Sequence, residues 1–111
     1  MSLNQKIEQL LSAVTTEIWP NSCPEEIPPD EYIVYKTKEE AVLYADNRDE
    51  EWGYFVDVHY FSKGNYISAK NKIRKLLRKN DFIVTDIETL HENGTGYHHV
   101  IVSCNTEESE E

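Results

Sequence analysis

The residues best suited to chemistry in this sequence are its histidines, its cysteines and the carboxylates close to them. His59 lies two residues after Asp57 in a run that alternates in character, so a strand would place both side chains on one face as a conceivable acid–base pair. The same spacing fits a carboxylate on a solvent-facing or strand-paired sheet surface, and we favour this simpler interpretation. We therefore expect no catalytic residue and a protein that is not an enzyme.

Residue spacing gives no support to a metal or cofactor site. His98 and His99 are adjacent in a predicted strand and would point to opposite faces, while His59 and His91 lie elsewhere in the chain. The glycines form neither a dinucleotide-binding motif nor a P-loop, and no serine lies in a Gly-x-Ser-x-Gly turn. We expect no bound metal and no cofactor.

Cys23 and Cys104 are the only cysteines, and neither belongs to a Cys-x-x-Cys pattern. We favour two free thiols in a reducing compartment, although a disulfide between them stays open. No apolar run approaches the roughly 20 residues of a membrane span, and the first residues lack the basic and apolar regions of a signal peptide. These features predict a soluble intracellular protein that does not bind membranes.

Charge is distributed unevenly along the 111 residues, whose formal net charge is −10. Residues 1–51 carry 12 acids against 4 Lys or Arg, residues 52–80 carry 1 against 7, and residues 81–111 carry 8 against none. An acidic protein as a whole is repelled by nucleic acid and by anionic membranes. One basic segment therefore lies inside an otherwise acidic chain.

The basic segment coincides with a predicted helix that begins at Tyr66. Its apolar residues recur at helical spacing and share one stripe: Tyr66, Ala69, Ile73, Leu76 and Leu77. The opposite face and its rim carry six cations, which are our candidate partner-interface residues: Lys70, Lys72, Arg74, Lys75, Arg78 and Lys79.

This cationic face allows three interpretations. It can be an ordinary solvated helix whose late cations interact favourably with the carbonyl end of the helix dipole. It can be a homotypic interface, in which the basic segment of one subunit meets an acidic segment of the next and favours a head-to-tail ring. It can also contact DNA, but this is not favoured, because aromatic residues are not interleaved among its lysines.

The helix follows the run most typical of a central strand, Gly53–Phe61, after a turn at residues 62–65. A first helix is predicted from Leu3 to Thr16, with Ser2 as its cap. All four prolines fall between Trp19 and Asp30, which predicts an extended connector that Trp19 and Ile27 could attach to the body.

Further strands are predicted on both sides of the basic helix. Tyr32–Thr37 is typical of a strand, residues 38–40 interrupt it, and Ala41–Ala45 is either a second strand, which we favour, or a helical turn. Residues 82–90 and 97–104 alternate and form a predicted hairpin, whose loop contains two glycines that supply positive φ.

Strict alternation in the first arm of this hairpin places Val84 and Ile87 on opposite faces. The order of elements favours an α+β domain, with a mainly antiparallel sheet of about four to five strands and two helices packed on one face. We assign one domain to residues 1–105, followed by an acidic tail, residues 106–111, that we expect to be disordered.

Several of these runs resemble small tail completion and tail terminator (head-tail joining) proteins of tailed phages and prophages. The matching runs are Ile33-Val34-Tyr35, Tyr44-Ala45-Asp46-Asn47 and Phe55 to Lys63, followed by the amphipathic helix and the closing hairpin. The Val56-Asp57 pair and the run Tyr60-Phe61-Ser62-Lys63 occupy the places of that family's Val-Asp-x-aromatic pattern and its Ser/Thr-Lys turn.

The resemblance implies a non-enzymatic virion component that caps the tail tube as a ring of subunits and joins it to the head connector. Its implied partners are other copies of the chain, the tail tube and the connector, and its implied location is the bacterial cytoplasm during assembly and then the virion. The family implies two helices against an antiparallel sheet and supplies no catalytic residues. The alternative that the composition leaves open is a small acidic regulatory module that occupies a basic site on a host protein.

Overall fold

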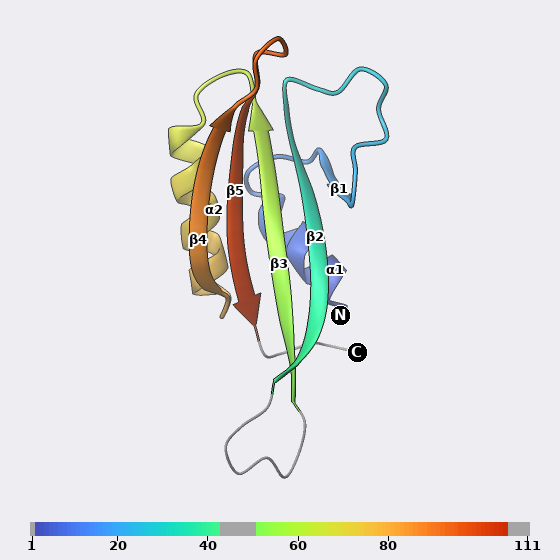
Figure 1. The fold of residues 1–111 in the computed structure, drawn as a ribbon, viewed down its shortest axis with the longest axis vertical. Helices are drawn as coiled ribbons and strands as arrows, with labels where there is room; N and C mark the ends of the chain where they lie inside the picture. Colours follow the sequence, from blue (N-terminus) through green and yellow to red (C-terminus); the bar gives the residue numbers. More distant parts are fainter. Residues whose placement is uncertain (1, 43–50, 107–111) are drawn as a thin grey trace.

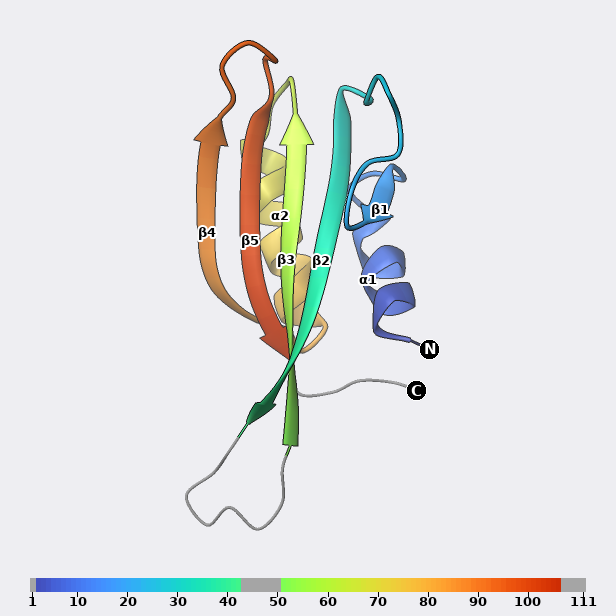
Figure 2. The same ribbon diagram turned by 45° about the vertical axis from the view of Figure 1, so that its right-hand side comes forward.

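The computed structural model describes residues 2–42 and 51–106, which form two helices and one five-stranded sheet. The elements follow the order α1 (Leu3–Leu11), β1 (Ile18–Pro20), β2 (Glu31–Val42), β3 (Glu51–Ser62), α2 (Ile67–Lys79), β4 (Ile83–His91) and β5 (His98–Thr106). The strand order is β1-β2-β3-β5-β4, and β1 and β2 are the one parallel pair among the described strands. Both helices lie behind the sheet in Figure 1, and Figure 2 shows the same arrangement after a turn. The predicted α+β class is confirmed.

Helix α1 begins as predicted and ends earlier than predicted. Ser2 forms a capping box with Gln5, since its hydroxyl accepts from the Gln5 amide at 3.2 Å and its own amide donates to the Gln5 side chain at 3.0 Å. The prediction that the helix reaches Thr16 was wrong, because a tight turn replaces the helix after Leu11. The amide of Val14 donates to the Leu11 carbonyl at 2.9 Å, which closes that turn.

The predicted connector contains the short strand β1, which lies against β2 with Ile18 opposite Ile33. Trp19 attaches the segment to the body as predicted, because its ring lies 6.3 Å from that of Tyr32. The same prediction was wrong for Ile27, whose side chain is 86% exposed. A hydrogen bond performs this role instead, in which the Tyr97 hydroxyl donates to the Pro29 carbonyl at 2.7 Å.

Strand β2 runs without a break, so the predicted interruption at residues 38–40 was wrong. Each of these residues pairs with β3, with Lys38 opposite Phe55 and Glu40 opposite Gly53. Charged side chains are tolerated there because they remain exposed. Of the predicted strand 41–45, the first two residues continue β2 and residues 43–45 lie outside the described residues. The predicted central strand is confirmed as β3 and is slightly longer than predicted.

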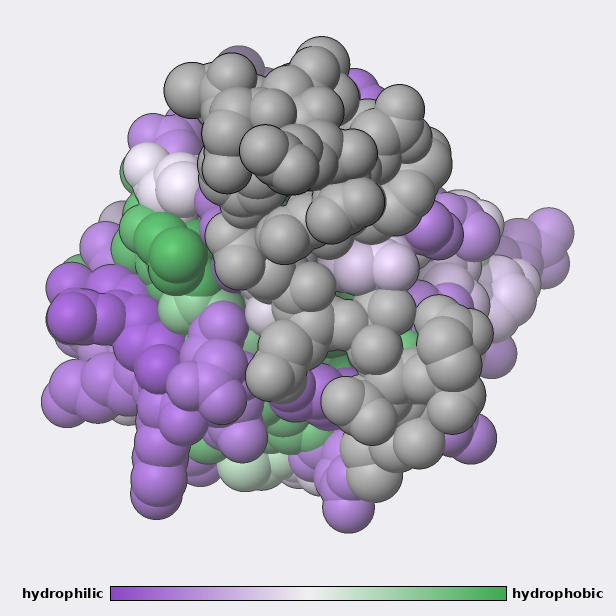
Figure 3. Space-filling view, turned by 90° about the horizontal axis from the view of Figure 1, so that it is seen from below, coloured by the Kyte–Doolittle hydropathy of each residue, from purple (hydrophilic) through white to green (hydrophobic). Residues whose placement is uncertain are grey.

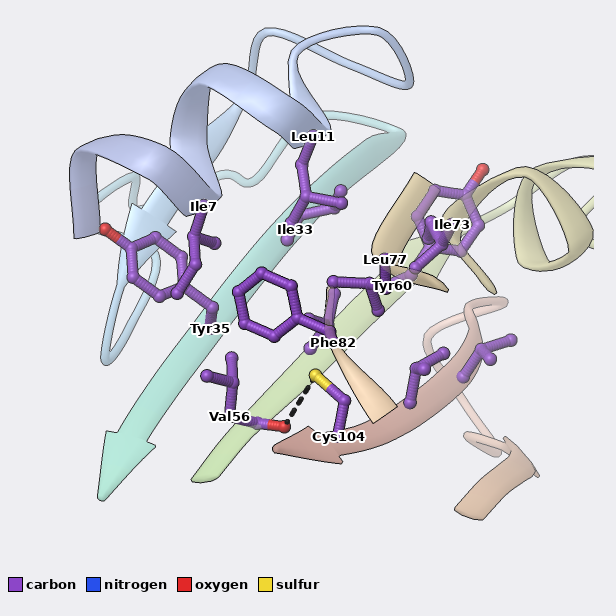
Figure 4. Packing of buried hydrophobic residues seen from close by; sticks show 13 residues of the cluster. Ile7, Leu11, Ile33, Tyr35, Val56, Tyr60, Ile73, Leu77, Phe82 and Cys104 are labelled. Carbon is purple, nitrogen blue, oxygen red and sulfur yellow. Dashed lines mark hydrogen bonds between the residues drawn. The ribbon is translucent and has the colours of Figure 1, made fainter. Parts of the chain in front are cut away.

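The hydrophobic core lies between the two helices and the face of the sheet that they cover (Figure 4). Helix α1 contributes Ile7 and Leu11, helix α2 contributes Ile73 and Leu77, and all four side chains are fully buried. The sheet contributes alternate residues of its strands: Ile33, Tyr35, Val56, Val58, Tyr60, Val100, Val102 and Cys104. Both predicted helix stripes therefore cover the same face of the sheet, and no helix among the described residues lies over the other face.

The hairpin of β4 and β5 is confirmed, but the predicted alternation in β4 was wrong. Val84 pairs with Cys104 and Asp86 pairs with Ser103, so Thr85 is an extra residue in a β-bulge. The bulge reverses the alternation, and Val84 and Ile87 both pack against the core beneath the helices.

The loop of this hairpin has the predicted backbone geometry, with φ of 89° at Gly94 and 81° at Gly96. Strand β5 continues to Thr106, which pairs with Tyr54, so the predicted tail begins at least one residue too early. Residues 107–111 of that tail lie outside the described residues. Neither helix of the described ranges is long and apolar enough to cross a membrane.

Candidate functional site

The cationic face of α2 lies where the sequence predicts it. The helix buries Ile73 and Leu77 and exposes four of the six predicted cations, while the other two, Lys70 and Arg74, are half-buried. The exposed four are Lys72, Lys75, Arg78 and Lys79. Within residues 2–42 and 51–106, the ion pairs do not include any of the six. Arg78 and Lys79 lie in the last turn, where cations complement the helix dipole.

Lys72 differs from the other cations because it joins the two helices. Its ammonium donates to the Ala13 carbonyl at 2.7 Å, in the turn that follows α1. Among the exposed cations of α2, the other three, Lys75, Arg78 and Lys79, make no side-chain hydrogen bond or ion pair to the described part of the chain.

A groove of about 700 Å³ separates the cationic face from the edge strand β4. Arg74 and Arg78 line one wall, and residues 82–87 line the other. Ile83 is 63% exposed at the start of β4, whose outer edge has no partner strand among the described residues. Figure 3 shows this end of the molecule, where hydrophobic surface lies beside strongly hydrophilic surface. Cationic, apolar and strand-edge features thus meet on one side of the protein.

Acidic side chains gather at the opposite edge of the sheet. Exposed acids lie just before strand β1, at Glu17, and in the connector that follows it, at Glu25, Glu26 and Asp30. Asp30 has a nearby cation, since its carboxylate lies 3.9 Å from Lys63 at an exposed position. The cations Arg74 and Arg78 line a groove at edge strand β4, whereas the acidic connector follows β1 at the other edge of the sheet. Figure 1 shows α2 and this connector on opposite sides of the ribbon.

The sheet face away from the helices, which we call the open face, carries a continuous stack of rings. Tyr32 stacks on Phe61 with 4.6 Å between ring centroids, and Phe61 stacks on His99 at 4.1 Å. Tyr97 packs edge-on against both Tyr32 and Phe61. Burial raises the pKa of the Tyr32 hydroxyl to about 12, with a further contribution from Tyr97. The open face therefore has a small apolar core of its own.

Two histidines and a glutamate form a polar chain on this face. His59 Nδ1 lies 2.8 Å from His99 Nε2, and His99 Nδ1 lies 3.4 Å from the Glu92 carboxylate. Burial lowers the pKa of both imidazoles. It outweighs the carboxylates that raise this pKa, which are Asp57 for His59, and Glu92 and Glu88 for His99. The conceivable pair with Asp57, which the sequence analysis did not favour, is not what holds His59, because the structure joins His59 to His99.

The other two histidines pair on the helix side of the sheet. His91 Nδ1 lies 2.8 Å from His98 Nδ1, and the His98 ring lies 4.7 Å from that of Tyr66 at the start of α2. His98 and His99 therefore point to opposite faces, as predicted. Across the described ranges, His, Cys, Asp and Glu side chains do not gather in groups of three that could hold a metal ion.

A hollow of about 290 Å³ opens beside the histidine chain. The connector at residues 21–23 lines it together with six side chains of the sheet: Tyr32, Val34, Lys36, His59, Phe61 and His99. The connector is fixed there by a hydrogen bond in which the Asn21 amide donates to the Tyr35 carbonyl at 2.9 Å. Sequence reasoning missed this site, because its residues come from segments whose register the sequence does not reveal.

The two cysteines are free thiols on different faces of the sheet. Cys23 lines the hollow on the open face and is half-buried. Cys104 belongs to the core, where its thiol donates to the Val56 carbonyl at 3.5 Å (Figure 4). Burial raises the pKa of the Cys104 thiol to about 12. The favoured prediction of two free thiols is confirmed.

Comparison with known proteins finds likeness in structure but not in sequence. No protein-family model and no curated protein matches the chain. A chain from the solved structure of the virion of a native gene transfer agent (GTA) particle has a similar fold, with a TM-score of 0.64. The match covers 94% of this chain and 89% of that chain at 6% sequence identity. At this identity the likeness shows that the two chains share a fold.

Proposed function

We propose that this protein is a structural component of a phage-like virion, and that within it the protein acts as a tail completion protein. In this role a ring of subunits caps the tail tube and joins it to the head connector. The observation that carries the proposal is the fold match to a virion chain, which covers 94% of this chain and 89% of that one. Such coverage means that the whole domain is shared, rather than one motif. Fold alone is an analogy for function, so the surfaces carry the next step.

The distribution of charge supports a ring. The cationic face of α2 and the acidic connector lie at opposite edges of one sheet. The connector of one subunit can therefore contact α2 of the next in a head-to-tail arrangement, which does not need the half-turn that relates the subunits of a two-fold dimer. A contact between two different surfaces is heterologous, and heterologous contacts close into rings when the rotation between subunits allows it. Charge complementarity would set the direction of packing.

The protein would act by shape and surface complementarity rather than by catalysis. It would assemble in the bacterial cytoplasm and remain in the virion, in contact with the tail tube and the connector. DNA contact is not part of the proposal, because the acidic connector and the net charge of −10 oppose it.

Native mass measured across protein concentration and salt tests the ring. Lys75→Glu with Arg78→Glu should abolish assembly, and Glu25→Lys with Glu26→Lys should do the same from the other side of the contact. Mixing the two variants should restore rings with an even number of subunits, because each reversed surface then meets a reversed partner. The matched control is Lys36→Glu with Lys38→Glu, which changes the net charge equally on the open face and should leave assembly intact.

A wild-type protein that stays monomeric at every concentration and salt would contradict self-assembly. The acidic connector then favours the second candidate function, a regulatory module that occupies a basic site on a host protein. Tight binding to a basic host protein, lost in the Glu25→Lys, Glu26→Lys variant and without effect on tails, would support that function.

A further inference from the structure

The hollow on the open face joins aromatic walls to a few polar groups, which is the usual composition of a binding site. Tyr32 and Phe61 form a stacked wall, with ring centroids 4.6 Å apart, and Val34 adds apolar surface. His59 and Lys36 provide the polar groups of the same hollow. Its volume of about 290 Å³ is near the lower end for small-ligand pockets.

The contacts of His99 with His59 and Glu92 indicate which nitrogen of each histidine carries a proton. A carboxylate can only accept, so His99 Nδ1 carries the hydrogen that faces the Glu92 side chain. Neutral His99 then has a lone pair on Nε2, which must accept from His59 Nδ1 at 2.8 Å. Neutral His59 therefore keeps a lone pair on Nε2. This nitrogen accepts no hydrogen bond from residues 2–42 and 51–106, so it is available to a ligand.

Lys36 complements this acceptor with a donor. It lies on β2, two residues after Val34, which pairs directly with His59. The Lys36 charge also contributes to lowering the pKa of His59, after burial and His99. Lys36 has no ion-pair partner among the described residues. One acceptor and one donor thus lie at the edge of an aromatic wall.

We propose that this hollow is a binding site for a phenol group. The ring packs on Tyr32 and Phe61, the phenol hydroxyl donates to His59 Nε2, and its oxygen accepts from the Lys36 ammonium. A carboxylate is a poorer match, because it has no hydrogen to donate to the neutral imidazole. The same chemistry can come from a free phenol or from a tyrosine side chain of another protein. The site is separate from the cationic face of α2 and goes beyond the role in a ring.

Titration of the intact protein with 4-methylphenol, followed by NMR of the four imidazoles, tests the site. We expect saturable shifts at His59 and His99, with His91 and His98 as internal references. Toluene, which has the same ring without the hydroxyl, should bind at least about fivefold more weakly, since it leaves the hydrogen bonds unmade. Lys36→Met should weaken 4-methylphenol binding by a similar factor, while Lys38→Met, on the same strand face outside the hollow, should not.

Affinity should also fall as the pH is lowered through the pKa of His59, because protonation removes the acceptor lone pair. N-acetyl-tyrosinamide distinguishes the two sources: binding at least as tight as that of 4-methylphenol indicates a tyrosine side chain, and its exclusion indicates a free phenol. Equal binding of toluene and 4-methylphenol would overturn the proposal. So would the absence of saturable shifts at His59 and His99, or equal effects of Lys36→Met and Lys38→Met.

Discussion

His59 Nδ1 lies 2.8 Å from His99 Nε2, although 40 residues separate the two histidines in the sequence. Strand register creates this contact. Phe61 pairs directly with His99 across β3 and β5, and His59 lies two residues before Phe61 on the same face. The two imidazoles are thus diagonal neighbours, close enough for a hydrogen bond. Burial holds the pKa of both below the ordinary value, which has consequences for stability.

The free energy of unfolding should fall as the pH is lowered below about 6.5, the ordinary pKa of histidine. Below that value the unfolded chain binds protons at His59 and His99, while the folded protein resists them because both folded pKa values are lowered. The unfolded state then binds more protons, so stability rises with pH in this window and is lost as pH falls. Denaturant unfolding at a series of pH values measures the slope.

The variant His59→Gln should flatten this slope, because it removes one of the two groups whose folded pKa is lowered. It is best compared with the wild-type protein at pH 8 as well, where both histidines are neutral and their contribution to the slope should vanish. An unchanged slope between pH 7 and 5 in His59→Gln would contradict a buried, coupled pair.

Leu77→Ala should reduce the free energy of unfolding by about 2–5 kcal/mol, the range for truncating a buried leucine. Leu77 is fully buried between α2 and the sheet. Ile67→Ala is the matched control, because Ile67 lies on the same helix and is 53% exposed. Its effect should stay within about 0.5 kcal/mol. Equal effects of the two substitutions would mean that α2 does not cover the sheet as described.

Tyr97→Phe should lower the free energy of unfolding by about 1 kcal/mol and loosen the connector, since it removes the hydroxyl that donates to the Pro29 carbonyl. Tyr66→Phe is a suitable control, because the Tyr66 hydroxyl makes no hydrogen bond to the described residues. Amide hydrogen exchange near residues 21–31 provides the measurement. Protection that is identical in wild-type protein and Tyr97→Phe would show that this hydrogen bond does not hold the connector.

Iodoacetamide at pH 8 should alkylate Cys23 first and Cys104 only as the protein unfolds. Cys104 is buried, and burial raises the pKa of its thiol to about 12, so little reactive thiolate forms in the folded state. Mass spectrometry of digests over time follows each site, and a sample in denaturant, in which both thiols react, is the control. Early alkylation of Cys104 in buffer would place it outside the core.

The periodicity of apolar residues in the sequence predicts which face of a helix or strand each residue lies on. Apolar spacing correctly places Ile73 and Leu77 on the buried face of α2, and alternation correctly separates His98 from His99. These features depend on residues that are close in sequence. The fold class follows from them, because two one-sided helices and a set of half-buried strands pack in few ways.

The features that sequence reasoning missed depend on pairing between distant segments. Periodicity gives the face of a strand but not its register, so the contact between His59 and His99 is not visible in the sequence. The bulge at Thr85 is another case, because one unpaired residue reverses the faces of Val84 and Ile87. The early end of α1 likewise depends on β1, whose pairing with β2 draws Ile18 to the sheet edge.

The most direct test of a role in the virion is to find this chain in purified particles. Tailed particles released by the producing cells would be separated on a density gradient, digested and searched for its peptides by mass spectrometry. Immunogold labelling would then locate the chain along the tail. The proposed function predicts peptides that copurify with intact particles, and label at the end of the tail that meets the head. Intact tailed particles that lack both the peptides and the label would contradict it.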